Sequence, residues 1–367
     1  MVRSQVLLKV IQTEPKQTTY QTEERRVQNS MNTYQTALKS YPERPQRKIL
    51  SPEQEEVPVI DFANFLNGSK VQQRKVALKV MTALEDYGQM ILVNHGVKES
   101  MMTEVFDESN KFFSLSPEEK LQYSYNSHRA NRGYLSAGTE KVHYGKEDIK
   151  ETMEIGKEDE EGMPNFWPTE VPSFKQPMLN IFSKLDDLQI KILRCIEIGL
   201  DLPEGAIIDK CNAQHENLRL LHYPSVHSST IDHSLKGTKR CADHTDYGTL
   251  TLLMQDKVGG LQLKLKNGDW IDVEPVEGGI IVQVADMLER WTNGLLPAAR
   301  HRVVSPVYKR NFEGWLPERF SVAFFCNPNK DAIIDALPNT FEDGIKPKLY
   351  KPFNAMEYLT LRLRASL

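Results

Sequence analysis

The amino-acid sequence predicts a mainly β protein with α-helices, in which a sandwich or jelly roll is flanked by helices from the N-terminal half. Two observations support this fold class. From Asn217 onward short β segments alternate with turns, whereas upstream apolar residues recur mostly at helical spacing. Short strands divided by glycine-rich turns are typical of a sandwich or jelly roll. We expect a mostly helical region over 57–200, and a β core with a C-terminal helix over 201–367.

The first 56 residues differ in composition from the rest of the chain. They are rich in Gln, Thr, Glu, Lys and Arg, and they show no sustained apolar period. Such a segment cannot bury enough apolar surface to offset the entropy of ordering it. We expect residues 1–56 to form a disordered or loosely helical extension. An organised lid or dimerisation arm is the alternative.

Local signals predict the elements of the N-terminal half in order. An apolar run at 57–62 predicts a strand, and apolar residues at helical spacing between Ala77 and Leu84 predict a helix that ends before Gly88. The segment Ser116 to Glu119 is a capping box with proline at the first helical position. The other predicted elements are a strand at 90–93, a helix around 102–106 and a long helix from about Phe174 to Leu200.

Short β segments make up the C-terminal half. The pair Asn267-Gly268 is the strongest hairpin signal in the chain, because both residues tolerate the positive φ of a two-residue turn. The predicted strands are Leu218 to Tyr223, Thr249 to Met254, Leu261 to Leu265, Trp270 to Val273, Ile280 to Val284 and Phe320 to Cys326.

The composition excludes several functional classes. The chain has 367 residues, 40% hydrophobic and 26% charged, with a formal charge of −4. We therefore expect neither nucleic acid nor a membrane as a partner, and no segment approaches the roughly 20 apolar residues of a transmembrane helix. The four cysteines are too scattered for a disulfide framework or a zinc ribbon. We expect reduced thiols, a cytoplasmic protein and a small-molecule ligand, and the oligomeric state stays open.

His244, Asp246 and His301 are the candidates for a metal site. In an extended chain residues two apart project to one face, so His244 and Asp246 can bind the same ion. His301 lies several strands further along and is the candidate for a third ligand. Two histidines and a carboxylate form the facial triad of non-haem Fe(II) oxygenases. They also suit Zn²⁺ in a hydrolase or lyase, and a His-x-Asp pair alone is compatible with a surface turn.

Two apolar strands direct polar side chains to one face. Alternation places Arg319 and Ser321 together on one strand, and Arg219 and Tyr223 together on another. A buried arginine is costly unless an anion meets it, and its guanidinium group matches a carboxylate. These residues therefore predict a cavity that binds an organic acid. The alternatives are a solvated arginine on an edge strand and a tyrosine in the core.

These residues together resemble a known family. The pattern is similar to the Fe(II)- and 2-oxoglutarate-dependent dioxygenases of the isopenicillin N synthase type, whose core is a double-stranded β-helix, or jelly roll. The resemblance covers about Val57 to Leu363 and includes Asp61 and Asn94-His95-Gly96. Within the family, fungal thymine 7-hydroxylases have the most similar strings, which here are Ala130 to Tyr134, Glu154 to Asp159, Leu218 to Pro224, His244 to Gly248 and Phe325 to Asn329.

The resemblance implies a role for each candidate residue. It implies that Fe(II) is bound by the metal-site candidates, which are His244, Asp246 and His301. It implies that the far carboxylate of the co-substrate 2-oxoglutarate is held by Arg319, Ser321 and Tyr223. The positions that match substrate-binding residues of the thymine 7-hydroxylases are Arg219, Tyr247 and Phe325. O₂ is the second co-substrate, and ascorbate is a candidate reductant.

The implied reaction is hydroxylation of an unactivated C–H bond in a small organic molecule, with release of succinate and CO₂. We expect a role in fungal secondary metabolism. Thymine or pyrimidine methyl hydroxylation is the alternative, as is desaturation or cyclisation on the same scaffold. A catalytically silent binding protein is a third class, which the complete set of six iron- and 2-oxoglutarate-binding positions disfavours.

Three features need a structural explanation. Ala285 stands where the family has a glycine, at a position that can require positive φ. Gln89 replaces the usual phenylalanine after Gly88. The acidic run Glu158 to Glu161 is expected to be a solvated loop, with the rim of the pocket as the alternative.

Overall fold

The computed structural model describes residues 56–124, 131–139, 150–227, 239–304, 314–342 and 344–365. The expected extension over residues 1–56 lies outside this part of the chain, except for Glu56. None of the helices within these ranges combines the length and the apolar character needed to span a lipid bilayer.

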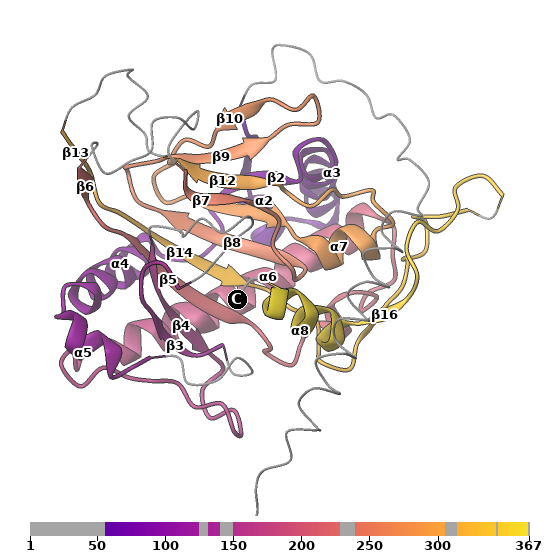
Figure 1. The fold of residues 1–367 in the computed structure, drawn as a ribbon. Coiled ribbons are helices and arrows are strands. Elements are labelled where there is room, and N and C mark those ends of the chain that lie inside the picture. The colour runs from indigo at the N-terminus through magenta and orange to yellow at the C-terminus, as the bar shows by residue number, and fades with distance from the viewer. Residues whose placement is uncertain are drawn as a thin grey trace, which may run out of the picture. The chain divides into compact units, whose positions relative to one another are not determined.

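Eight strands form the larger of two main sheets, in the order β1-β2-β11-β8-β14-β5-β4-β3 (Figure 1). β1 and β2 are parallel, and every other neighbouring pair in this sheet is antiparallel. The strands are β1 (Val59–Asp61), β2 (Gln89–Val93), β3 (Gly133–Leu135), β4 (Glu151–Gly156), β5 (Asn217–Tyr223), β8 (Leu250–Gln255), β11 (Ile280–Val284) and β14 (Arg319–Phe325).

The smaller main sheet has the order β10-β9-β12-β7 and is antiparallel. Its strands are β7 (Lys239–His244), β9 (Leu261–Lys264), β10 (Trp270–Asp272) and β12 (His301–Val304). Four short strands form two further antiparallel pairs, and they are β6 (Val226–His227), β13 (Trp315–Leu316), β15 (Ile333–Ile334) and β16 (Phe353–Asn354).

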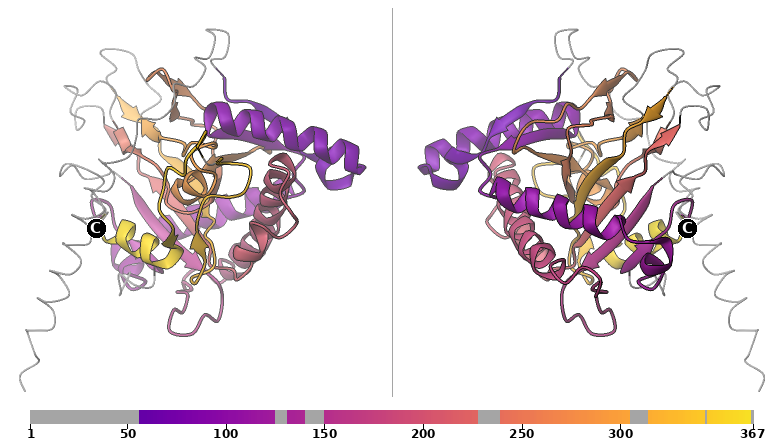
Figure 2. Two further views of the ribbon diagram at one scale, coloured as in Figure 1. Left: turned by 90° about the vertical axis from the view of Figure 1, so that its right-hand side faces the viewer. Right: turned by 90° about the vertical axis from the view of Figure 1, so that its left-hand side faces the viewer.

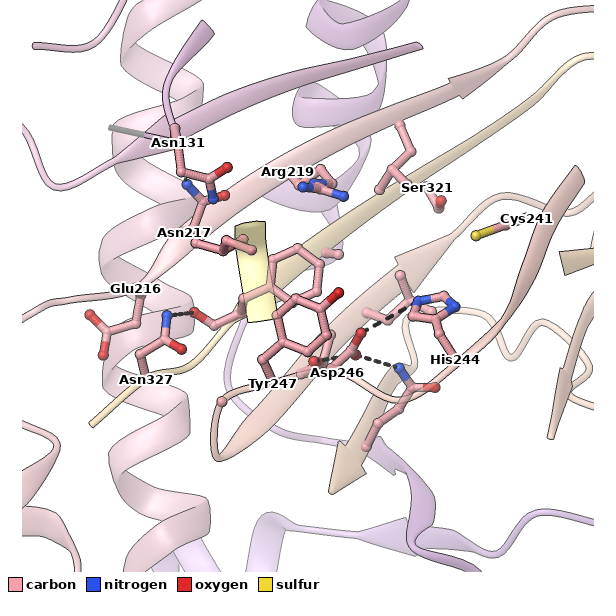
Figure 3. A pocket seen from close by; sticks show the side chains of 18 of the residues that line it. Asn131, Glu216, Asn217, Arg219, Cys241, His244, Asp246, Tyr247, Ser321 and Asn327 are labelled. Atoms are coloured by element: carbon pink, nitrogen blue, oxygen red, sulfur yellow. Dashed lines mark hydrogen bonds and ion pairs between the residues drawn. The ribbon is translucent and has the colours of Figure 1, made fainter. Parts of the chain in front are cut away.

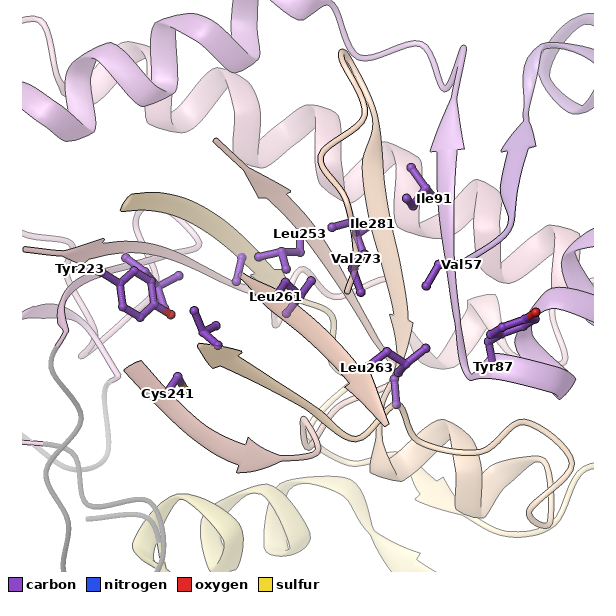
Figure 4. Close-up of a cluster of buried hydrophobic side chains, with 14 residues drawn as sticks. Val57, Tyr87, Ile91, Tyr223, Cys241, Leu253, Leu261, Leu263, Val273 and Ile281 are labelled. Atoms are coloured by element: carbon purple, nitrogen blue, oxygen red, sulfur yellow. The ribbon is translucent and has the colours of Figure 1, made fainter. Parts of the chain in front are cut away.

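One buried cluster draws side chains from both main sheets (Figure 4). Leu253 and Ile281 come from the larger sheet, whereas Cys241, Leu261 and Leu263 come from the smaller one. The space between the sheets is therefore a hydrophobic core, as a jelly roll requires. The predicted fold class is confirmed.

Helices from the N-terminal half cover the outer face of the larger sheet. Phe182 of α6 packs edge-on against Phe324 of β14, and Phe113 of α4 packs against His222 of β5. The shorter α8 lies on the opposite side of this sheet from α6 (Figure 2). The helices are α2 (Ala63–Asn67), α3 (Lys70–Tyr87), α4 (Glu99–Phe113), α5 (Pro117–Leu121), α6 (Lys175–Gly199), α7 (Asp286–Trp291), α8 (Ala355–Ala365) and the 3₁₀ turn Ile208–Lys210.

Three local predictions are confirmed. α3 ends at Gly88, which adopts a left-handed φ of 68°. Ser116 and Glu119 form both hydrogen bonds of the capping box before α5. Asn267-Gly268 lies in the turn between β9 and the antiparallel β10. Each signal is local, so short sequence was sufficient to find it.

Two strands that were not predicted lie in the region expected to be mostly helical. β3 and β4 extend the larger sheet beyond β5. β4 carries Glu151 on one face and Glu154 on the other, and both are buried. Polar residues on both faces remove the apolar alternation by which a strand is recognised.

Lys120 of α5 and Glu151 of β4 form a buried ion pair. Lys120 Nζ lies 2.9 Å from Glu151 Oε2, and both residues are at most 7% exposed. Burial raises the pKa of Glu151, but hydrogen bonds from His222, Tyr134 and Lys120 outweigh it and hold this pKa below its ordinary value. The carboxylate is therefore charged and depends on its donors.

Lys120→Met is expected to lower the free energy of unfolding by about 3 kcal/mol, because it leaves the buried Glu151 carboxylate without its cation. Urea denaturation at pH 7 measures the change. The control is Lys184→Met, which removes an exposed pair with Asp187 and should cost less than about 1 kcal/mol. Equal effects of the two substitutions would contradict the prediction.

Candidate active site

The structure brings His244, Asp246 and His301 together. His244 ends β7, Asp246 follows in the turn, and His301 opens β12 directly opposite His244. Nε2 of His244 lies 3.6 Å from Asp246 Oδ1, and Nε2 of His301 lies 4.0 Å from the same oxygen. Of the His, Cys, Asp and Glu side chains in the described ranges, these three form the group that can hold a metal ion.

A backbone carbonyl orients each histidine. Nδ1 of His244 lies 2.8 Å from the Ala242 oxygen, and Nδ1 of His301 lies 3.0 Å from the Ala299 oxygen. A proton on each Nδ1 leaves the Nε2 lone pair for a metal. Burial, aided by the nearby His244, lowers the pKa of His301 to about 4. Its imidazole is therefore neutral near pH 7, which suits a metal ligand.

Hydrogen bonds from a hydroxyl group and from a pair of side-chain amides fix the carboxylate of Asp246. Its Oδ2 accepts hydrogen bonds from Thr251 Oγ1 at 2.6 Å and from Gln283 Nε2 at 3.4 Å. Gln89 Nε2 donates in turn to Gln283 Oε1 at 2.7 Å. Oδ1 is left on the side of the histidines, and Figure 3 shows Asp246 directed toward His244. Gln89, which stands where the family usually has a phenylalanine, is therefore connected to the metal-site carboxylate through Gln283. This connection was not predicted from the sequence.

Arg319 places a positive charge in the same cavity. It is 1% exposed, and its N–H groups donate to Gly259 O at 2.7 Å, Ser321 Oγ at 3.0 Å and Gln255 Oε1 at 3.1 Å. Its guanidinium lies over the Tyr223 ring, 5.0 Å from the centroid. Every one of these partners is neutral, and no carboxylate in the described ranges forms an ion pair with Arg319. Its charge therefore lacks a counter-ion among the side chains that the structure describes.

A second buried guanidinium lies nearby. Arg240, in β7, is 1% exposed and donates to the Pro224 carbonyl at 3.2 Å. Burial lowers its pKa, and so does the neighbouring Arg319. Two buried like charges are unfavourable unless an anion joins them. Arg319, Ser321 and Tyr223 line one cavity with the metal-site residues, so its cationic end suits an organic acid.

Two family models match the chain. Residues 57–170 match the N-terminal region of the non-haem dioxygenases in morphine synthesis, and residues 214–328 match the 2OG-Fe(II) oxygenase superfamily. The chain belongs to the 2-oxoglutarate- and Fe(II)-dependent oxygenase superfamily. It is a 2-oxoglutarate-dependent dioxygenase that uses Fe(II) and oxidises a small organic molecule. This membership decides against the zinc hydrolase and the silent binding protein.

Similar proteins cover almost the same length as this oxygenase. The 2-oxoglutarate-dependent dioxygenase frbA of a Dothideomycetidae species is 33% identical over 82% of this chain and 94% of its own. The dioxygenase ecdK of Aspergillus rugulosus is 30% identical over 83% of this chain and 98% of its own. The crystal structure of the Neurospora crassa thymine 7-hydroxylase with α-ketoglutarate and thymine is 36% identical, with a TM-score of 0.77 over 87% of this chain and all of that one.

The residues predicted to bind substrate also line the cavity of the oxygenase, and they are Arg219, Tyr247 and Phe325. The guanidinium of Arg219 lies 5.3 Å from the Phe325 ring centroid and forms an ion pair with the buried Glu154. This carboxylate partner was not predicted, because Glu154 lies in β4, a strand that has no apolar alternation.

The C-terminal helix forms an apolar wall of this cavity. Met356, Leu359 and Leu363 of α8 line it. Arg362 places its guanidinium 4.4 Å from the Tyr247 ring centroid and ion-pairs with Asp286 at 2.5 Å. α8 is thus attached to the first residue of α7, whose backbone N–H donates to the Asp246 carbonyl at 2.9 Å.

The structure answers two questions about loops. Ala285 has φ −110° and ψ 173°, which is extended backbone, so this position does not require the positive φ that a glycine would permit. In the acidic run, Glu160 pairs with Arg132 at 2.9 Å and Lys330 at 2.6 Å and lines the cavity. The rim of the pocket is therefore the correct placement for Glu160.

Glu216→Gln is expected to change how stability depends on pH. Burial and the neighbouring Asp186 raise the pKa of Glu216 to about 8. The neutral carboxyl group contributes stability that is fully present below the ordinary pKa of glutamate and is lost as the pH rises through 8. Glutamine stays neutral, so the variant should gain about 3 kcal/mol over the wild type between pH 5 and pH 8.

Urea denaturation at both pH values measures this difference. The control is Glu204→Gln, whose side chain is 74% exposed and which should leave the pH dependence unchanged. The prediction fails if Glu216→Gln and the wild type lose stability equally between pH 5 and pH 8.

Proposed function

We propose that His244, Asp246 and His301 bind Fe(II) and that Arg319 anchors the far carboxylate of 2-oxoglutarate, with Ser321 and Tyr223 beside it. The reaction is hydroxylation of an unactivated C–H bond in a small molecule of fungal secondary metabolism. The observation that supports the proposal is a buried arginine that pairs with no carboxylate of the described residues and that shares a cavity with two histidines and a carboxylate. This donor set suits Fe(II), and this charge suits a dicarboxylate.

Iron, when bound, supplies the activation of O₂ that couples decarboxylation of 2-oxoglutarate to oxidation of the substrate. The protein supplies position and charge. The guanidinium of Arg319 holds the co-substrate by a charge-assisted contact, and Asp246 is held by Thr251 and Gln283 so that Oδ1 faces the histidines. The apolar wall of α8 excludes water from the reacting carbon.

The test measures O₂ uptake and succinate release with Fe(II), 2-oxoglutarate and a panel of fungal metabolites that contain unactivated C–H bonds. We expect uptake that requires 2-oxoglutarate and rises with at least one metabolite, whose mass increases by one oxygen. Uptake independent of 2-oxoglutarate would contradict the proposal. Desaturation or cyclisation would appear as the loss of two hydrogens in the product.

Thymine is a second candidate substrate and belongs in the panel. The Neurospora protein crystallised with thymine is 36% identical, and Arg219, Tyr247 and Phe325 line the cavity here. If thymine is the substrate, 5-hydroxymethyluracil should form together with an equal amount of succinate. Failure of thymine to stimulate succinate release would remove this candidate.

A further inference from the structure

Asn217 lines the cavity that also contains the metal-site residues and the proposed 2-oxoglutarate anchor. It opens β5, where it pairs with Gly156 of β4 on one side and Phe325 of β14 on the other. It is 5% exposed and lines the cavity. Figure 3 shows it beside Asn131, with Arg219 between it and Ser321. Alternation along β5 directs Asn217, Arg219 and Tyr223 to the same face.

The orientation of the Asn217 amide is fixed by its neighbours. Its Nδ2 donates to the Asn131 carbonyl at 2.9 Å. The reverse orientation would place Oδ1 against that carbonyl oxygen, so it is excluded. Oδ1 is buried, and no N–H or O–H group in the described part of the chain donates to it. An acceptor left in this state is costly and rare in native proteins.

The charged groups around Asn217 are already paired. The guanidinium group of Arg132 packs directly on the backbone of Gly156. A Cβ atom at position 156 would lie 1.7 Å from Cζ of Arg132. It donates to Glu160 at 2.9 Å and to the Asn131 carbonyl at 3.0 Å. Arg219 likewise pairs with the buried Glu154. Each of these guanidinium groups has a carboxylate partner, so this part of the cavity suits a neutral donor better than an anion.

We propose that Asn217 is a specificity-determining residue whose Oδ1 accepts a hydrogen bond from an N–H group of the primary substrate. The substrate class is therefore neutral molecules that carry an amide N–H, such as lactams, cyclic imides or peptide amides. This inference rests on the proposed function, because it concerns the substrate of the same site. An N-alkylated analogue or a hydrocarbon leaves the Asn217 acceptor unpaired and binds more weakly.

The test compares the binding of 2-pyridone and N-methyl-2-pyridone, which differ in the N–H group. Both are titrated anaerobically into the full chain loaded with Fe(II) and 2-oxoglutarate, and line broadening of the probe by the iron measures binding near the metal. We expect the wild type to bind 2-pyridone about tenfold more tightly, as one hydrogen bond to a buried acceptor predicts. Asn217→Leu should reduce this ratio to about one.

Asn217→Ser is the matched control. Its hydroxyl oxygen keeps an acceptor at this position while its O–H group donates to the Asn131 carbonyl, which also keeps its hydrogen bond from Arg132. This variant should retain the preference for the N–H probe. Equal binding of the two probes to the wild type would overturn the inference. A preference that survives Asn217→Leu would overturn it as well.

The visible absorption band of the iron complex with 2-oxoglutarate separates this inference from the proposed function. The wild type and both Asn217 variants should show the band, since Asn217 belongs to neither the metal site nor the 2-oxoglutarate anchor. If the band is absent from the wild type, the proposed function fails. If the band is present and the two probes bind equally, only the assignment of Asn217 fails.

Discussion

Asp246→Ala is expected to lower iron affinity by more than about 100-fold and to abolish succinate release. The substitution removes the carboxylate whose Oδ1 lies within 4.0 Å of both histidine Nε2 atoms. Even residues that only support a metal ligand change affinity by about 10- to 100-fold, so loss of a ligand should exceed this. Metal content after dialysis and the rate of succinate release measure the effect.

Asp243→Ala is the matched control for this substitution. Asp243 lies in the same strand as His244, but its carboxylate pairs with the partly exposed Arg300 at 2.8 Å. This variant should bind iron as the wild type does. If Asp246→Ala retains iron and turns over at the wild-type rate, the assignment of the metal ligands is wrong.

Arg319→Met is expected to raise the KM for 2-oxoglutarate by about 100-fold, because truncation of a buried charge partner costs about 2–5 kcal/mol. Iron affinity should stay near the wild-type value, since Arg319 contacts none of the three metal-site residues through the hydrogen bonds it makes. Initial rates at varied 2-oxoglutarate concentration, with iron binding measured separately, give the two quantities.

Ser321→Ala and Arg194→Met are the controls for this substitution. Ser321→Ala removes one neutral hydroxyl group and should raise the KM by only about fivefold. Arg194→Met removes an arginine of α6 that pairs with Glu197 and Glu204 and does not line the cavity, so it should leave the KM unchanged. An unchanged KM in Arg319→Met would show that another group holds the co-substrate.

Much of the site followed from residue spacing. The period of two in β14 placed Arg319 and Ser321 on one face, and the same period in β5 placed Arg219 and Tyr223 together. The structure places these side chains on the cavity face of the sheet. A shift of one residue in strand register would move them to the face that the helices cover, where their charges would be buried without partners. Bringing His301 to His244 required the pairing of β12 with β7, which the resemblance supplied and spacing alone did not.

Other parts of the site had no local signal. Gln89 and Gln283 lie 194 residues apart and meet because β2 and β11 are adjacent in the sheet. Arg240 carries no motif, and its relation to Arg319 depends on how the two sheets meet. Glu154 was missed because its strand has polar residues on both faces. Long-range pairing and buried polar contacts are properties of the folded chain and not of a short window.

The central claim is that one cavity holds Fe(II) at His244, Asp246 and His301 and 2-oxoglutarate at Arg319. Anaerobic addition of Fe(II) and then 2-oxoglutarate, followed in the visible spectrum, tests it most directly. We predict a charge-transfer band that requires both components, is absent from Asp246→Ala, and needs about 100-fold more 2-oxoglutarate in Arg319→Met. A wild-type protein that binds Fe(II) without developing this band, or a band unaffected by both substitutions, would contradict the account.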